Sequence, residues 1–226
     1  MFAVIFVVQP KKGRMDDYLN QAKLLKPELE KIDGFIDNER FGSKRDERRV
    51  LSLSTWRDEK AVIRWRTLGI HHGVQEKGRF EIFDDYHLRV GEFTADNKVP
   101  KGQKLQELRF DETVIGKAKA TTISELTPAK GEKPASTDLA VDLGLPKSGA
   151  DGMTDQEVFE GITNPGKLLL LVAWRDAVAA EHWKPETVAG GTLRHRQVRV
   201  IRQYGMSDRR EAPQYYPPVE KVGSAA

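Results

Sequence analysis

The sequence has no cysteine among its 226 residues, and this absence removes several chemistries at once. Without a thiol, a protein has no disulfide framework, thiolate zinc site, iron–sulfur cluster or cysteine nucleophile. An excess of charge of one sign is also missing, because 37 Lys and Arg stand against 34 Asp and Glu. Nucleic-acid binders usually concentrate positive charge on one face, so we expect no nucleic-acid partner.

Long hydrophobic runs are equally scarce, and none reaches the roughly 20 apolar residues that a membrane-spanning helix needs. The apolar run at residues 1–8 ends at once at Gln9 and Pro10. It lacks the positive start and the small-residue cleavage site of a signal peptide, so it predicts a buried β-strand. We therefore expect a cytoplasmic protein that has no membrane partner.

The sequence also lacks the short motifs that accompany common cofactors. It contains no phosphate loop, no Gly-x-Gly-x-x-Gly after a strand, no His-Glu-x-x-His and no Gly-x-Ser-x-Gly. We therefore expect no metal site and no bound nicotinamide or ATP.

Hydrophobic periodicity predicts four strands and two helices in the first 93 residues. In chain order we expect a strand at 1–8, a helix at 11–31 that Pro27 kinks or divides, strands at 35–41 and 50–56, a helix capped by Asp58, and a strand at 83–93. The order β-α-β-β-α-β is that of the ferredoxin-like, split βαβ fold.

An internal repeat decides how many such units the chain holds. When residues 39–66 are placed beside 157–184, nine of 28 positions are identical, where chance would give about two. All four tryptophans fall in this alignment, as the matched pairs Trp56/Trp174 and Trp65/Trp183. The chain is therefore expected to carry two copies of one unit.

The match between the copies resumes after a shift, when residues 88–90 align with 198–200 and Arg89 with Arg199. The second copy has thus lost residues around its second helix. Its first helix is missing or short, with a remnant expected near 137–143. Because Arg89 and Arg199 stand at matching positions, each is expected either in a structural ion pair, with Glu39 or Glu157 as partner, or in substrate binding.

We divide the chain into repeat 1 at 1–94, a linker at 95–118, a degenerate repeat 2 at 119–206 and a C-terminal tail at 207–226. Helices cover one face of each sheet, so the other face needs a partner. The expected fold is α+β, with tandem ferredoxin-like repeats that pack their antiparallel sheets into an α+β barrel. Such a barrel permits a monomer with an internal pseudo-dimer, while exposed edges would permit a homodimer.

Residues 50–65, with the continuations 71–79 and 86–90, resemble the antibiotic biosynthesis monooxygenase (ABM) domain. The usual form of that domain is a strand, a Trp, a helix with a second Trp nine residues on, a histidine-containing helix and a final Tyr-x-x-Arg-Val strand. Residues 1–93 match it throughout, and residues 155–206 match only the strand–Trp–helix–Trp section and the last strand.

The resemblance implies a dimeric α/β barrel, here formed within one chain. Some family members are cofactor-free oxygenases of polyphenolic substrates, and others bind and degrade heme. The heme-degrading branch uses an Asn in the first strand, a Trp, and a His ten residues after that Trp. Trp65 matches the Trp, but Gln75 stands at the His position and Val7 and Val8 stand in the strand without an Asn. A heme ligand could still come from His71 or His72.

The two copies differ on one face of their third strand. The first copy has Ser52 and Ser54 where the second has Leu170 and Val172. Residues i and i+2 share a face, so small polar side chains leave room for a ligand that large aliphatic ones would fill. We expect the pocket in the first repeat and a mainly structural second repeat.

His71 and His72 are the candidate bases, because an unperturbed histidine titrates near pH 6.5. Only one of two adjacent helical residues can point inward, and we expect it to be His72. The bland alternative is a solvated pair at a helix end. Tyr86 could donate a hydrogen bond to a substrate oxygen or simply pack at the start of a strand.

Five further residues are expected to bind the substrate: Trp65, Ser52, Ser54, Gln75 and Arg89. For Trp65 the alternative is a core residue under its helix, which the matching Trp183 favours. The first functional hypothesis is a cofactor-independent monooxygenase of a small aromatic or polyketide-like substrate. A heme-binding protein and a non-catalytic small-molecule or interaction domain are the alternatives.

Overall fold

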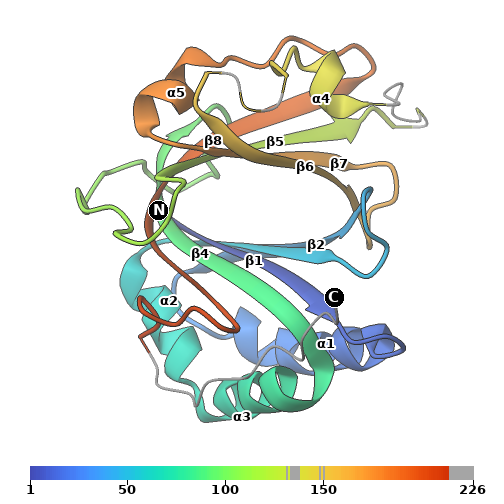
Figure 1. The fold of residues 1–226 in the computed structure, drawn as a ribbon, viewed down its shortest axis with the longest axis vertical. Coiled ribbons are helices and arrows are strands. Elements are labelled where there is room, and N and C mark those ends of the chain that lie inside the picture. The colour runs from blue at the N-terminus through green and yellow to red at the C-terminus, as the bar shows by residue number, and fades with distance from the viewer. Residues whose placement is uncertain (131, 133–137, 148, 150, 214–226) are drawn as a thin grey trace, which may run out of the picture.

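The computed structural model describes residues 1–130, 132, 138–147, 149 and 151–213. Within these ranges, eight antiparallel strands close into one barrel in the order β1-β3-β2-β6-β7-β5-β8-β4 (Figure 1). Repeat 1 supplies β1 (Phe2–Pro10), β2 (Phe35–Ser43), β3 (Val50–Trp56) and β4 (Phe83–Asp96). Repeat 2 supplies β5 (Ala120–Pro128), β6 (Met153–Gly161), β7 (Leu168–Trp174) and β8 (Gly191–Gly205). The expected tandem α+β barrel is confirmed.

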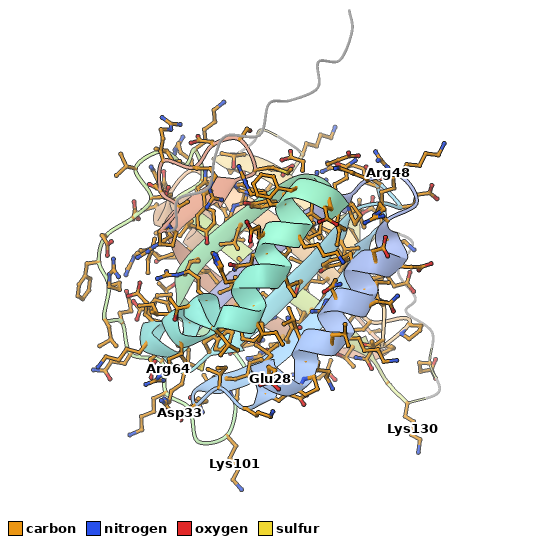
Figure 2. The ribbon with its side chains drawn as sticks, turned by 90° about the horizontal axis from the view of Figure 1, so that it is seen from below. Glu28, Asp33, Arg48, Arg64, Lys101 and Lys130 are labelled. Atoms are coloured by element: carbon orange, nitrogen blue, oxygen red, sulfur yellow. The ribbon has the colours of Figure 1, made fainter. Side chains whose placement is uncertain are left out.

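Helices cover the barrel on two opposite sides (Figure 1). The repeat 1 layer consists of α1 (Met15–Glu30), α2 (Glu59–Thr67), α3 (Gly69–Lys77) and a π-helical turn, η1 (Gly78–Ile82). The repeat 2 layer consists of α4 (Leu139–Asp142), within the range expected for a remnant, and α5 (Ala177–His182). Figure 2 views the molecule from the repeat 1 side, where the helices lie across the sheet and labelled charges such as Asp33 and Arg64 lie at the rim.

The first helix is not divided at its proline. Helix α1 runs through Pro27 to Glu30, so Pro27 lies in the last turn. There the missing N–H removes one hydrogen bond but leaves the preceding turns intact.

The barrel interior is one hydrophobic core that both repeats share. Its fully buried side chains come from inward-facing positions of all eight strands and include Ile5, Phe41, Ile123 and Phe159. Strand β2 carries a bulge between Phe35 and Asp37, which turns Phe35 outward onto Trp56 at a ring-centroid distance of 5.4 Å. Phe35 and Phe41 therefore lie on opposite faces of the strand, although an uninterrupted alternation over 35–41 would place them on the same one.

The scaffold of the two repeats is nearly the same in detail. Gly34 and Gly152 both adopt positive φ, at 91° and 82°. A Cβ on either glycine would lie 2.7 or 2.8 Å from the Cβ of Ala61 or Ala179, so only glycine fits beneath each helix.

The strand pairing corrects the alignment of the last strands. Ile5 pairs with Arg89 across β1 and β4, and Ile123 pairs with Arg196 across β5 and β8. Because the repeat relates Ile5 to Ile123, the counterpart of Arg89 is Arg196, and the expected match with Arg199 is wrong. The similar triplets at 88–90 and 198–200 shift the sequence alignment by three residues from the structural one.

The expected ion pairs of these arginines are wrong as well. Arg199 binds the carboxylate of Glu107 at 2.5 Å, on the outside of the barrel. Glu39 binds Lys167 at 2.5 Å, and Glu157 binds Arg49 at 3.1 Å. Both glutamates therefore pair with cations that directly precede a strand, Lys167 before β7 and Arg49 before β3, because Arg199 faces away from them.

The segment between β4 and β5 is irregular but anchored. The fully buried carboxylate of Glu92 accepts hydrogen bonds from the backbone N–H groups of Leu108 and Arg109, both at 2.9 Å. Residues 214–226 of the expected tail lie outside the described residues. In the described part of the chain no helix is long and apolar enough to cross a membrane.

Candidate functional site

A cavity of about 210 Å³ lies between the outer face of the repeat 1 sheet and its helices. Its walls come from β1 to β4, from all three α-helices of this layer and from the end of β8. The apolar part of the lining includes Val4, Phe6, Leu25, Val62, Ile82, Phe83, Leu88 and Val90.

Small side chains on β3 keep this space open. Ser52 and Ser54 line the cavity, whereas their counterparts Leu170 and Val172 are fully buried in the core of repeat 2. Both serines also accept hydrogen bonds, Ser52 from Asn38 at 3.0 Å and Ser54 from the indole N–H of Trp56 at 2.9 Å. Each hydroxyl oxygen is thus fixed, and its proton is left to rotate.

His71 faces the cavity from α3. Its ring stacks on Trp65 with a centroid distance of 4.0 Å and an interplanar angle of 17°. Its Nδ1 lies 2.9 Å from the carbonyl oxygen of Trp65, which only accepts, so Nδ1 carries the proton and Nε2 keeps a lone pair. Burial lowers the pKa of His71 to about 4. The imidazole is therefore neutral at physiological pH and offers Nε2 as an acceptor.

His72 is the exposed member of the pair, so the expectation that it points inward is wrong. Helix α3 turns one stripe toward the cavity, formed by His71, Val74, Gln75 and Gly78. These positions follow the i, i+3, i+4, i+7 spacing of one helix face, and His72 lies off it.

Two polar groups in the cavity complement the histidine. Gln75 presents a buried Oε1 that has no hydrogen-bond partner among the described residues. The hydroxyl oxygen of Tyr86 accepts hydrogen bonds from Arg79 at 3.1 Å and from Arg209 at 2.7 Å. Since guanidinium groups only donate, Tyr86 keeps its own proton as a donor. The site thus holds one acceptor amide and one polarised phenol.

The charged side chains that line the cavity are mostly cationic. Among the described residues, one carboxylate, Glu59, and five guanidinium groups line it, the latter from Arg40, Arg66, Arg79, Arg202 and Arg209. Glu59 is already engaged by Arg202 at 3.0 Å and by Arg109 at 2.5 Å. An apolar cavity with cationic walls suits an organic anion.

Most of the sequence candidates converge here and two do not. Trp65, His71, Gln75, Ser52, Ser54 and Tyr86 line the cavity. Arg89 points to the other side of the sheet, into the barrel, so the expectation that it shares this site is wrong. The arginines were missed because a single Arg in a charged sequence looks like a surface residue. Arg79 does stand inside the stretch that resembles the family.

The residues present limit what the site could hold. No group of three or more His, Asp or Glu that could bind a metal ion occurs among the described residues. Among the described residues that line the cavity, only His71 offers an imidazole lone pair, with Nδ1 tied to a carbonyl as is usual for a histidine that ligates a metal. A heme iron would therefore be held by His71.

Comparisons with known proteins agree with this architecture. The family model for antibiotic biosynthesis monooxygenase (ABM) matches residues 1–77. A protein of Pyricularia oryzae named jasmonate monooxygenase ABM is 40% identical over 223 residues, which cover 96% of this chain and 99% of that protein.

Two solved structures share the fold at much lower identity. One is an aldoxime dehydratase with 12% identity and a TM-score of 0.54, covering 89% of this chain and 81% of that chain. The other is an aldoxime dehydratase in complex with butyraldoxime, with 11% identity and a TM-score of 0.55, covering 90% of this chain and 81% of that one.

Proposed function

The chain belongs to the antibiotic biosynthesis monooxygenase family, and from this premise we propose a monooxygenase that acts on a small organic anion with an apolar body. Jasmonate is the first such substrate to test, because a relative of nearly the same length is named for it. The reaction takes place in the cavity of repeat 1.

The observation that carries this proposal is the charge of the cavity lining. Five arginines and one engaged glutamate surround an apolar floor, so a carboxylate or phenolate is attracted while its hydrocarbon part is buried. Jasmonate is a carboxylate, and a phenolic or polyketide-like compound can present a phenolate. Both substrate classes fit this chemistry.

We propose a reaction that needs no cofactor, with His71 and Tyr86 as its catalytic residues. The Nε2 atom of His71 takes a proton from a carbon that a neighbouring carbonyl makes acidic. The Tyr86 hydroxyl donates a hydrogen bond to the oxygen on which negative charge develops. A base as weak as His71 suits only such an activated carbon.

The balance then closes without an outside reductant. The substrate carbanion gives its electrons to O₂ and forms a hydroperoxide on the same carbon. Loss of water from the hydroperoxide leaves a carbonyl, so a CH₂ group plus O₂ becomes C=O plus H₂O. One oxygen atom enters the product, as a monooxygenase requires.

Oxygen uptake and ¹⁸O₂ incorporation test the proposal, with jasmonate and 1-naphthol as probes and no added reductant. We expect uptake with at least one probe and one labelled oxygen atom in its product. His71→Gln should lower the rate by about 10²–10⁴-fold, the usual contribution of a general base. Tyr86→Phe should lower it by about 10²-fold or more. His72→Gln is the matched control on the exposed face, and we expect less than about twofold change.

No uptake and no binding of either probe would overturn the substrate class. Equal losses in His71→Gln and His72→Gln would overturn the placement of the site.

Heme binding is the second candidate, favoured by the unprotonated Nε2 of His71. Bound heme would supply redox chemistry at its iron. The absorption spectrum of protein purified after heme supplementation separates the two. A Soret band that is lost in His71→Gln, with oxygen uptake only in the heme-loaded protein, would replace the cofactor-independent reaction.

A further inference from the structure

A second and larger cavity, of about 400 Å³, lies inside the barrel at one end. Both repeats line it, and the repeat 1 sheet separates most of it from the cavity beneath the helices. Its apolar wall includes Val7 and Leu171, and its polar wall includes His87, Arg89 and Gln203. The family assignment and the proposed function leave this space unexplained.

Arg89 is the uncompensated charge in this cavity. Among the described residues no carboxylate lies within 4.0 Å of its guanidinium, and its buried Nε has no hydrogen-bond partner. Burial lowers the pKa of Arg89 to about 10, although Asp155 opposes this shift from a greater distance and Arg49 adds to it. Arg89 is half-buried, and a guanidinium withdrawn from water without a close anion is costly, so such groups are normally paired.

The opposite end of the barrel shows how the same arginine is paired in repeat 2. Arg196, the counterpart of Arg89, is buried and forms an ion pair with Glu125. Its Nε, like that of Arg89, has no hydrogen-bond partner among the described residues, so the carboxylate alone distinguishes the two arginines. Lys167 also binds Glu125, at 2.5 Å. Asp96 stands directly across from Arg196 in the pairing of β4 with β8.

Two carboxylates are missing at the Arg89 end. The strand registers make Val7 the counterpart of Glu125, because Val7 pairs with Leu51 and Glu125 with Leu169. Gln203 stands across from Arg89 where Asp96 stands across from Arg196. The cavity lies beside Val7, in the space that the Glu125 side chain occupies at the other end.

The remaining charges at this end do not replace them. Glu157 is held by Arg45 and Arg49, both at 3.1 Å. Asp85, Asp155 and Asp208 line the cavity and add negative charge. These acidic groups repel a doubly charged phosphate or dicarboxylate more strongly than a monocarboxylate, whose single charge can lie on the guanidinium.

We infer that the barrel interior is a second binding site, for a small monocarboxylate whose carboxylate pairs with Arg89 in the place that Glu125 takes beside Arg196. The rest of the ligand lies against Val7 and Leu171. This site is on the opposite face of the sheet from the proposed catalytic cavity, and it stands or falls independently of the reaction proposed there.

NMR of the arginine side chains tests the inference directly. The Nε–H signal of Arg89 is identified by its absence in Arg89→Lys. We expect it to move saturably with sodium acetate and with sodium butyrate at concentrations up to about 100 mM, but not with sodium chloride at equal ionic strength. Butyrate should bind more tightly, by up to about fourfold per buried methylene.

Two substitutions of nearly equal size distinguish the effect of a negative charge from the effect of filling the cavity. Val7→Glu places an internal carboxylate beside Arg89, and Val7→Gln fills the same volume without charge. Val7→Glu should abolish the acetate response and raise the Tm above that of Val7→Gln by roughly 2–4 °C. Arg89→Met, which removes the charge together with the reporter signal, should still fold, and acetate should then raise its Tm no more than chloride does.

The inference fails if the Arg89 signal shows no saturable shift with either carboxylate. It fails also if chloride moves the signal as acetate does, because the site would then bind any small anion and would not recognise a carboxylate. A Tm of Val7→Glu that does not exceed that of Val7→Gln would equally overturn the pairing with Arg89.

Discussion

The outer faces of the two repeats carry the same scaffold but differ in what fills it. In repeat 1, Trp65 is half-buried, stacks on His71 and lines an open cavity. In repeat 2, its counterpart Trp183 is buried and packs on Trp174 at a ring-centroid distance of 5.9 Å. One duplicated framework thus serves as a pocket on one side of the barrel and as a closed core on the other.

Few changes separate the two outcomes. Leu170 and Val172 replace two serines on the third strand, and all of β7 is buried. No helix follows α5 in residues 183–190, where the chain runs directly to β8. In repeat 2 the shorter helical layer packs directly on the larger side chains of β7. In repeat 1 the helical layer also contains α3, and a space remains between this layer and the small side chains of β3.

The largest effect should come from removing the buried tryptophan of repeat 2. Trp183→Ala should lower the free energy of unfolding by about 3–5 kcal/mol, because it leaves a cavity in a closed core. Trp65→Ala should cost less than half as much, since Trp65 already borders open space. Urea denaturation of both variants measures the difference, and equal costs would contradict the distinction between core and pocket.

Converting the pocket into a core should remove binding while the fold is retained. The variant combines Ser52→Leu and Ser54→Val with Val4→Thr. The threonine is needed because the indole N–H of Trp56 would lose its acceptor Ser54, whereas that of Trp174 donates to Thr122, the counterpart of Val4, at 2.9 Å.

We expect this triple variant to bind jasmonate at least about 100-fold more weakly, or about 2.7 kcal/mol. Titration calorimetry measures the affinity, and a melting curve shows whether the protein is folded. Unchanged affinity in a folded variant would place the substrate elsewhere.

The sequence was sufficient to predict the barrel, because paired tryptophans and alternating strands reflect constraints that act along the chain. It also brought Trp65, His71 and Tyr86 together, since the family pattern spaces them. The choice between His71 and His72 depended on where α3 begins. Leu68 lies between α2 and α3 in extended conformation, and this break determines which residues of α3 face the cavity. No pattern in the sequence marks a break of one residue.

Arg89 shows a different limit. Its counterpart could be read only from strand pairing, because a three-residue similarity in the sequence pointed to Arg199 instead of Arg196. The arginines of the repeat 1 cavity come from segments as distant as Arg40 and Arg209. Sequence reasoning has no means of placing such residues around one space until the fold is known.

Because the pKa of His71 is low, the rate of the reaction proposed for the repeat 1 cavity should stay nearly constant in mildly acidic solution. Burial lowers the pKa of His71 to about 4, so Nε2 stays unprotonated between pH 7 and pH 5. We expect kcat/KM to change by less than about twofold over that range, whereas a base with an ordinary pKa of about 6.5 would lose roughly 25-fold. A pH–rate profile decides between them.

The lowered pKa of His71 also makes the free energy of unfolding depend on pH. The unfolded chain takes up a proton near pH 6.5 and the folded one only near pH 4, so protons favour the unfolded state in that window. Stability should therefore fall as the pH drops from 6.5 to 4, and less steeply in His71→Gln. A slope that is the same in both proteins would show that His71 is not buried in its neutral form.

The smallest effect concerns what the two repeats share. Asp58 and Asp176 cap α2 and α5, and each accepts a hydrogen bond of 2.8 Å from the third residue after it. Asp58→Ala and Asp176→Ala should each lower the free energy of unfolding by about 1 kcal/mol, and the two losses should agree within about 0.5 kcal/mol. Equal losses, measured in urea, would mean that the duplicated framework is energetically the same on both sides of the barrel. The difference between pocket and core would then belong to the side chains on β3 and β7 and to α3, and not to a weakened second repeat.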